Sequence, residues 1–237
     1  DHFLLQEVRQ YGVGEILEGA EVTGASRTEG GILLTTAGEG PVIRCELMLL
    51  ACGIPGHGLQ GLVAGLPEAK DQGLGIRAYY EGVTGFGEDQ AIEIHFLKEL
   101  LPCYLWIFPL GGGAANVGLA LPSERVVKKK IVLKELLSHL LEKYPHLKSR
   151  FSQAVMPRRM EAHRLAFYHG RIPVSSDRLL LLGDAARLVD PFTGEGIGNA
   201  MVSGAVAAET AMRALLAGDF SAKQLEAYDK ALYDKLE

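Results

Sequence analysis

A carboxylate and three alternating glycines lie close together in the segment from Arg178 to Ala200. A short apolar run, Leu179 to Leu182, comes first and is followed by Gly183 and Asp184. Such a run, bounded by turn-forming residues, is typical of a strand buried on both faces of a parallel sheet. Ligands bind at the carboxyl ends of strands in open α/β sheets, where a carboxylate can accept hydrogen bonds from sugar or ribityl hydroxyls. The segment therefore predicts a cofactor site.

The glycines at positions 194, 196 and 198 continue this pattern. Glycine lets the backbone adopt positive φ and approach a flat ligand closely. A helix rich in small residues is expected from about Ile197 to Leu216. Its N-terminus favours negative charge, such as a phosphate or the anionic N1–C2=O edge of a reduced flavin. The alternative is a purely structural strand-turn-helix of an α/β domain.

Two motifs, in this order along the chain, resemble the geranylgeranyl reductase branch of the para-hydroxybenzoate hydroxylase-like flavoproteins. The first comprises Tyr104, Trp106, Phe108 and Pro109 with Asn116, Val117 and Gly118, and is similar to a Tyr-x-Trp-x-Phe-Pro and Asn-Val-Gly signature of these reductases. The second is similar to their second FAD-binding motif and comprises Gly183, Asp184, Ala185, Ala186, Pro191, Gly194, Glu195, Gly196, Ile197, Gly198, Asn199, Ala200 and Met201. By general layout the resemblance extends from Asp1 to about Leu216.

The resemblance implies an FAD-dependent reductase of carbon-carbon double bonds in a polyprenyl, geranylgeranyl-type lipid. Reduced flavin would deliver hydride from N5 to one alkene carbon, and a site group or water would protonate the other. Asp184 would hold the ribityl chain, and the backbone from Gly194 to Gly198 would lie against the isoalloxazine. The implied cofactor-binding set is Gly183, Asp184, Ala185, Pro191, Gly194, Gly196, Ile197, Gly198 and Asn199. No residue is assigned as the catalytic proton donor.

The aromatic motif predicts a row of rings. Tyr104, Trp106 and Phe108 alternate with Leu105 and Ile107, so on a strand the three aromatics project from one face. The resemblance implies that they form a wall for the substrate. The alternative is that the aromatic stripe is simply hydrophobic core.

The expected fold is an FAD/NAD(P)-binding, Rossmann-like α/β fold with an inserted, mainly antiparallel substrate sheet. We expect residues 1–70 and 156–220 to form the FAD-binding domain, 71–155 the substrate-binding domain and 221–237 a C-terminal helix. No strand with a Gly-x-Gly-x-x-Gly turn for the ADP half of FAD opens the chain, so we expect an N-terminally truncated fragment or one part of a longer polypeptide. Gly56 to Gly61 does match that pattern, but Gly65 and Pro67 follow too soon for a crossover helix.

The cysteines, and one departure from the family pattern, concern redox chemistry. Cys52-Gly53 stands where relatives carry Asp-Gly, which leaves the electron donor open between NAD(P)H and a reduced carrier protein. Cys45, Cys52 and Cys103 have no metal-ligand spacing, so we expect no metal site and reduced, mostly buried thiols. Cys103 is expected to be packed, with a reactive thiol as the alternative.

Composition favours a cytoplasmic protein, with peripheral contact at the inner face of the membrane as a further hypothesis. No apolar run approaches the roughly 18 residues needed to span a bilayer, and the net charge of -5 disfavours nucleic acid as a partner. Ser123 is expected to cap a helix that continues to Tyr144, where Pro145 stops it. Its polar side carries Lys128, Lys129, Lys130 and Lys134, which suit either an anionic membrane surface or plain solvent.

The remaining elements follow from periodicity and turn residues. Strands are expected at about 15–24, 31–36, 44–51, 75–80, 91–97, 104–109 and 115–120, and helices at 3–11 and 225–236. Two enzymatic alternatives share the expected fold, an FAD-dependent aromatic monooxygenase and a flavin halogenase. A non-catalytic lipid- or flavin-binding fragment is the third alternative.

Overall fold

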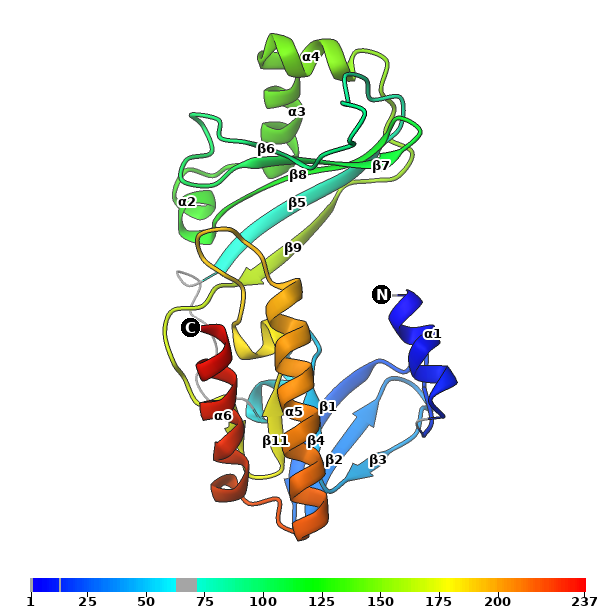
Figure 1. The fold of residues 1–237 in the computed structure, drawn as a ribbon, viewed down its shortest axis with the longest axis vertical. Coiled ribbons are helices and arrows are strands. Elements are labelled where there is room, and N and C mark those ends of the chain that lie inside the picture. Colours follow the sequence, from blue (N-terminus) through cyan, green and yellow to red (C-terminus); the bar gives the residue numbers. More distant parts are fainter. Residues whose placement is uncertain (1, 13, 63–71) are drawn as a thin grey trace. The chain divides into compact units, whose positions relative to one another are not determined.

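The computed structural model describes residues 2–12, 14–62 and 72–237 (Figure 1). The chain divides into two structural units. The first consists of Asp1–Leu47 and Gly56–Ala64, and the second of Met48–Pro55 and Gly65–Glu237. The division falls inside the segment that was expected to be one strand, 44–51, because that segment contributes to a separate sheet in each unit.

The first unit is a small antiparallel sheet with two short helical segments. Its sheet has the order β1 (Val22–Thr28), β2 (Gly31–Thr36), β3 (Ile43–Cys45), and its helices are α1 (His2–Gln10) and η1 (His57–Leu62). The expected strand at 15–24 is wrong in position, because the tight turn at Gly30, with φ +86°, pairs Thr28 with Gly31 and fixes the register. The expected helix at 3–11 and strand at 31–36 are confirmed.

The Gly-x-Gly-x-x-Gly match at 56–61 lies mostly in η1, a single 3₁₀ segment. A Cβ on Gly58 would lie 1.8 Å from the carbonyl oxygen of Thr23, so this glycine is required by close backbone packing on β1. Packing on β1 therefore explains why residue 58 is a glycine, and a bound nucleotide is not needed to explain it. Gly65 and Pro67 lie outside the described residues.

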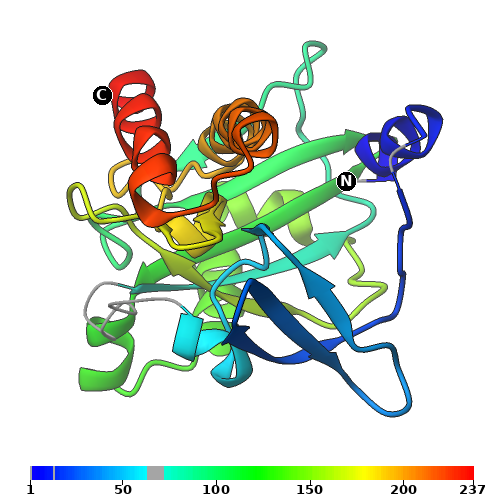
Figure 2. The same cartoon turned by 90° about the horizontal axis from the view of Figure 1, so that it is seen from below.

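The second unit contains a three-stranded sheet that carries the glycine segment. Its order is β10 (Ser175–Ser176), β11 (Leu179–Leu181), β4 (Met48–Leu50), and β11 runs parallel to β4. The residues of β11 are buried, as expected for a strand covered on both faces. Figure 2 shows α5 (Ile197–Ala217) and α6 (Ala222–Leu236) side by side next to this sheet. Tyr228 of α6 is fully buried and its hydroxyl donates to the carbonyl of Leu181 over 2.7 Å, which fixes α6 to β11.

A larger, antiparallel sheet occupies the rest of this unit. Its order is β6 (Glu93–His95), β7 (Leu105–Gly111), β8 (Ala114–Pro122), β5 (Gln72–Tyr80), β9 (Glu161–Ala166). The helices α2 (Ser123–Lys128), α3 (Leu133–Lys143) and α4 (Pro145–Phe151) contribute to the core on one face of the sheet (Figure 1). That core includes Leu105, Ile107, Val117, Leu119, Leu137, Leu140 and Leu147, all of them inaccessible to solvent. The expected α/β fold with a mainly antiparallel larger sheet is confirmed. β9 extends this sheet from beyond residue 155, and the assignment of roles to 1–70, 71–155, 156–220 and 221–237 stays a prediction.

The expected single helix from Ser123 to Tyr144 is wrong. Lys130 adopts a left-handed conformation, with φ +51°, and Ile131 donates its N–H to the carbonyl of Val126, so α2 ends and the chain turns Ile131 toward the core. Ser123 is the first residue of α2 and makes no capping hydrogen bond. Pro145 begins α4 as well as ending the previous segment, since its fixed φ suits a first helical position.

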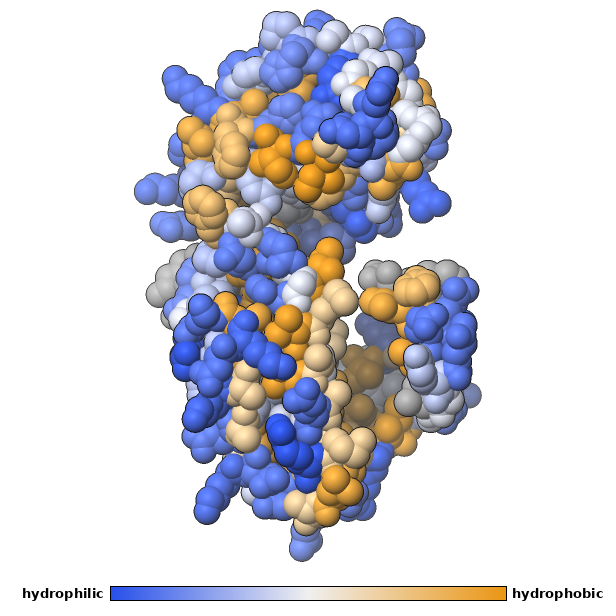
Figure 3. Space-filling model, viewed as in Figure 1, coloured by the Kyte–Doolittle hydropathy of each residue, from blue (hydrophilic) through white to orange (hydrophobic). Residues whose placement is uncertain are grey.

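One described helix, α5, is long and apolar enough by length and composition to cross a membrane. The expectation that no segment approaches that length is therefore wrong, because moderately apolar alanines extend the run between larger side chains. Core helices of soluble proteins pass the same test, and α5 packs against α6 and the 3₁₀ segment η3 (Gly183–Ala186). Ile197, Met201, Met212 and Leu215 of this helix are exposed. Apolar side chains are visible over α5 in Figure 3.

Candidate functional site

The turn after β11 brings the site carboxylate to the end of the sheet. Gly183 has φ +55°, a conformation that favours glycine, and a Cβ there would lie 3.1 Å from the Cβ of Ala200. Its N–H donates to the buried Ser203 Oγ over 3.0 Å, and that hydroxyl donates to the carbonyl of Ala200. The turn is thus fixed directly to α5. Asp184 follows at the carboxyl end of β11, as predicted.

Asp184 is a half-buried acceptor without a donor. Within the described ranges its carboxylate accepts no hydrogen bond, and burial raises the pKa of the group above its ordinary value. A Cβ built on Gly196 would lie 3.6 Å from Asp184 Oδ1, so the carboxylate lies beside the glycine loop. Hydroxyl donors from a bound ligand would satisfy this carboxylate and offset its desolvation. The arrangement fits the ribityl chain of a flavin.

The loop before α5 is fixed by Asp190, a residue that the sequence analysis missed. Asp190 Oδ1 accepts hydrogen bonds from the N–H groups of Phe192 (2.9 Å) and Thr193 (2.6 Å) and from Thr193 Oγ1 (2.8 Å). These bonds hold the pKa of Asp190 below its usual value. The backbone of Asp190 also bonds to Gly194 and Glu195. An Asp followed by Pro and a Thr is a recognisable turn signal and could have identified this role.

The N-terminus of α5 is already partly occupied by a side chain. Gly198 donates its N–H to Glu195 Oε1 over 2.5 Å. Asn199 Nδ2 donates to the carbonyl of Leu188 over 2.7 Å and ties the first turn to the preceding segment. A carboxylate at this end interacts favourably with the helix dipole, so Glu195 competes with any anionic ligand for it. The sequence predicted the positive helix end but not this competitor.

The three aromatic residues form a continuous row, with Tyr104 immediately before β7 and Trp106 and Phe108 on one face of that strand. The ring centroids of Tyr104 and Trp106 are 6.4 Å apart, and those of Trp106 and Phe108 are 6.2 Å apart. Leu105 and Ile107 point to the opposite face and supply the core, whereas Trp106 and Phe108 are only half-buried. The row is therefore separate from the helix-covered core of the sheet.

The aromatic row joins the glycine loop. The hydroxyl of Tyr104 donates to the carbonyl of Thr193, and a Cβ on Gly194 would lie 3.2 Å from that hydroxyl. Burial raises the pKa of Tyr104, so this hydroxyl keeps its proton as a donor. The structure thus brings together the two motifs, which lie about 80 residues apart in the chain.

Asn116 and Gly118 fix the orientation of Trp106. Trp106 Nε1 donates to Asn116 Oδ1 over 2.9 Å. A Cβ on Gly118 would lie 2.3 Å from Trp106 Cζ2, so the indole lies directly over this glycine. The two residues are two positions apart on β8 and share a face, while Val117 between them points into the core. Asn116 and Gly118 of the Asn-Val-Gly motif therefore hold the indole in its position.

The cysteines show no sign of activation. Burial raises the pKa values of Cys45 and Cys103, and Cys103 packs against the core, as expected. Cys52 is exposed, so the expectation of mostly buried thiols is wrong for this residue, which follows β4 in a surface turn. The described part of the chain holds no cluster of three metal-ligating side chains.

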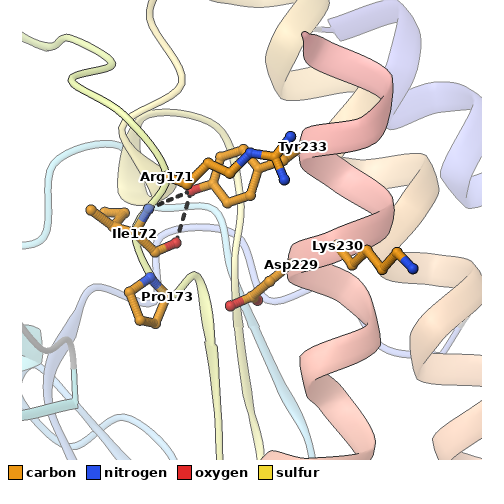
Figure 4. Close-up of a pocket in the computed structure, with 6 residues that line it drawn as sticks. All are labelled: Arg171, Ile172, Pro173, Asp229, Lys230 and Tyr233. Atoms are coloured by element: carbon orange, nitrogen blue, oxygen red, sulfur yellow. Dashed lines mark hydrogen bonds between the residues drawn. The ribbon is translucent and has the colours of Figure 1, made fainter.

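A hollow of about 290 Å³ lies against α6 and not at the glycine loop. Figure 4 shows its lining, in which the hydroxyl of Tyr233 donates to the carbonyl of Ile172 (2.8 Å) and accepts its N–H (3.2 Å). Arg171 lies over the Tyr233 ring, with 5.6 Å between its guanidinium carbon and the centroid. These contacts attach residues 171–173 to α6, which is a structural role.

Comparisons with known proteins show what the sequence and the fold resemble. Residues 144–232 match the FAD binding domain family. A digeranylgeranylglycerophospholipid reductase of Thermoplasma volcanium is 35% identical over 134 residues, which are 56% of this chain and 32% of that protein. Digeranylgeranylglycerophospholipid reductase 2 of Methanococcoides burtonii is 33% identical over 209 residues, which are 84% of this chain and 47% of that protein. The chain matches 32% and 47% of the length of these two curated relatives.

Solved structures share the fold. A geranylgeranyl bacteriochlorophyll reductase-like protein of Thermoplasma acidophilum superimposes with a TM-score of 0.77 at 23% identity, covering 90% of this chain and 53% of that one. A flavin-dependent brominase superimposes with a TM-score of 0.77 at 24% identity, covering 96% and 57%. The chain thus has a fold that flavin-dependent proteins share, and residues 144–232 match an FAD binding domain.

In sequence the chain is similar to digeranylgeranylglycerophospholipid reductases. The resemblance inferred from the two motifs is confirmed.

Proposed function

We propose that this protein is an FAD-dependent reductase of carbon-carbon double bonds in a polyprenyl, geranylgeranyl-type lipid. The observation that carries the proposal is the junction of a half-buried carboxylate that accepts from no described residue, an exposed glycine loop and an aromatic row. Asp184 supplies the acceptor, and the Tyr104–Thr193 hydrogen bond joins the loop to the row. The names of the homologues supply the substrate class.

The cofactor-binding roles divide between backbone and side chains. Asp184 would accept hydrogen bonds from ribityl hydroxyls, and the exposed backbone around Gly194 and Gly198 would lie against the flavin ring. Larger residues at these glycines would meet Tyr104 or Glu195. The other members of the proposed set, Gly183, Ala185, Pro191, Gly196, Ile197 and Asn199, shape or support this surface.

When bound, reduced FAD supplies the hydride for one carbon of the double bond. The chain's own contribution is to position the two reactants and keep water away. Tyr104, Trp106 and Phe108 offer a half-buried apolar wall, which suits an isoprenoid chain and gives it little to hydrogen-bond. Because the Tyr104 hydroxyl donates the hydrogen bond that holds the loop, we assign it a positioning role.

The electron donor and the location are proposed more broadly. Reducing equivalents come from NAD(P)H or from a reduced carrier protein. The protein works in the cytoplasm, in peripheral contact with the inner face of the membrane that contains its lipid substrate. Residues 71–155 contribute the substrate-binding part and residues 156–220 the cofactor-binding part.

The test is an anoxic reduction assay with the protein, FAD, a chemical reductant and a digeranylgeranylglycerophospholipid. The expected product gains two hydrogens for each double bond reduced, as measured by mass spectrometry. Oxygen consumption with oxygenation or halogenation of an aromatic compound, and no lipid reduction, would instead support a monooxygenase or a halogenase. Lipid binding without turnover in protein that has bound FAD would support a non-catalytic binding fragment. Either result would overturn the proposal.

A further inference from the structure

We propose that the turn joining α2 to α3, residues 127–134, docks the protein on an anionic lipid bilayer. The inference rests on the proposed function, because it explains how a water-insoluble substrate reaches the aromatic row. It identifies the surface that makes the contact, and the evidence is the charge, exposure and rigidity of that turn.

The turn concentrates positive charge on a protein of opposite net charge. Lys128, Lys129, Lys130 and Lys134 are all exposed, and none of them forms an ion pair with another residue that the structure describes. The whole chain carries a formal net charge of -5. Lysines near an anionic membrane surface each contribute favourably to binding. Four such lysines with no acidic partner therefore complement an anionic surface.

Apolar side chains accompany the lysines. Val127 is 72% exposed and Val132 is 53% exposed, one on each side of the three consecutive lysines. Ile131, by contrast, packs against the core of the sheet. Exposed apolar residues beside basic ones are the composition of interfacial membrane-binding segments, in which the apolar groups enter the headgroup region.

The backbone of the turn is fixed. Lys129, Lys130 and Ile131 donate their N–H groups to the carbonyls of Arg125, Val127 and Val126, respectively. The turn thus needs little ordering when it binds, which reduces the entropic cost of docking.

The turn is also connected to the proposed substrate wall. Arg125 of α2 donates to the carbonyls of Leu100 (3.3 Å) and Leu101 (2.7 Å). Leu101 is 51% exposed, and Phe96, five residues before it, is 65% exposed. The ring of Phe96 lies 5.9 Å from that of Tyr104, the first member of the aromatic row. Apolar side chains gather on this part of the surface in Figure 3. A lipid leaving a bilayer at the turn would therefore meet apolar groups up to the row.

The test is flotation of the purified chain with vesicles of phosphatidylcholine, with or without phosphatidylglycerol. We expect binding to the anionic vesicles, weakened by salt, and little binding to phosphatidylcholine alone. Replacing Lys128, Lys129 and Lys130 with Gln should lower the partition coefficient about a hundredfold. The matched control replaces Lys223, Lys230 and Lys235, three exposed lysines of α6, and should have a much smaller effect.

A second variant probes the apolar component. Val127→Ser with Val132→Ser should weaken binding to anionic vesicles several-fold while leaving its salt dependence intact. Equal losses from the two lysine triples would overturn the proposal, and so would binding to heparin without binding to vesicles. Reduction of detergent-dispersed lipid should persist in all variants. If the unaltered protein binds the vesicles but does not reduce the dispersed lipid, the proposed function is contradicted and the docking proposal is not.

Discussion

Replacing Gly118 with Ala should displace the indole of Trp106 from the open face of the large sheet. The added Cβ would lie 2.3 Å from Trp106 Cζ2 and 2.4 Å from the carbonyl oxygen of Ile76 on the neighbouring strand. Non-bonded carbon atoms prefer separations of about 3.5–4.0 Å, so the ring has to move by about 1.2 Å or more. That movement also strains the Nε1 bond to Asn116.

The loss of folding stability caused by Gly118→Ala can be estimated from these two contacts. The Ile76 carbonyl belongs to the β5–β8 ladder and cannot turn away freely, so the crowding is that of an overpacked site, about 1–3 kcal/mol. For a chain of this size about 1 kcal/mol lowers Tm by roughly 2–4 °C, which gives a fall of about 2–12 °C. Since Trp106 is the only tryptophan in the chain, its fluorescence reports the movement, and the emission should shift to longer wavelength.

Gly75→Ala is the matched control. Gly75 is a buried glycine on β5, on the same face of the sheet, and a Cβ there would have nothing closer than 3.8 Å. The control should keep the native emission and lose little or no stability. Identical emission and Tm in the two variants would refute the inference that Gly118 seats the indole.

Three further predictions concern the cofactor half-site. Ser203→Ala removes the acceptor of the Gly183 N–H and should cost about 1–3 kcal/mol in urea unfolding, because a buried donor loses its partner; an unchanged midpoint would contradict this. Glu195→Gln removes the carboxylate that accepts from Gly198, and should raise the reduction potential of bound flavin by about 10–20 mV in a dye-equilibrium titration; a lower potential would exclude the proposed competition. Burial raises the pKa of Asp184 above its ordinary 3.8, and ligand hydroxyls favour the ionised form. FAD affinity should therefore rise as the pH increases from 3.8 through the raised pKa of this group. The cofactor-free protein should lose stability over the same window, since the folded state binds the extra proton. Asp184→Asn should abolish both trends in calorimetric titrations, and trends that persist in this variant would rule out Asp184 as their source.

Local patterns in the sequence predicted the parts of the site that depend on near neighbours. The strand, turn and helix around Gly183, and the one-sided aromatic row at β7, follow from periodicity and turn chemistry alone. The pairing of β9 with β5 joins segments more than 80 residues apart, which no local pattern specifies. The break between α2 and α3 depends on a left-handed lysine and on the burial of Ile131, so propensity favoured one continuous helix.

The same distinction applies to individual side chains. The special residue types at Asp184 and Gly196 marked them as candidates. Asp190 and Glu195 act through hydrogen bonds that form only once the loop has folded, so their roles became visible in the geometry. Gly118 was visible as part of a motif, but the reason for a glycine lies in the indole above it.

The central claim is that Asp184 and the glycine loop hold the flavin. The most direct test is a titration of FAD into the purified chain, followed by flavin absorbance and fluorescence, with Asp184→Ala beside the surface control Asp234→Ala. We predict a shifted flavin spectrum and measurable affinity for the unaltered chain and the control, with at least a tenfold loss for Asp184→Ala, equivalent to about 1.4 kcal/mol. Equal affinity in Asp184→Ala and the unaltered chain would contradict the account.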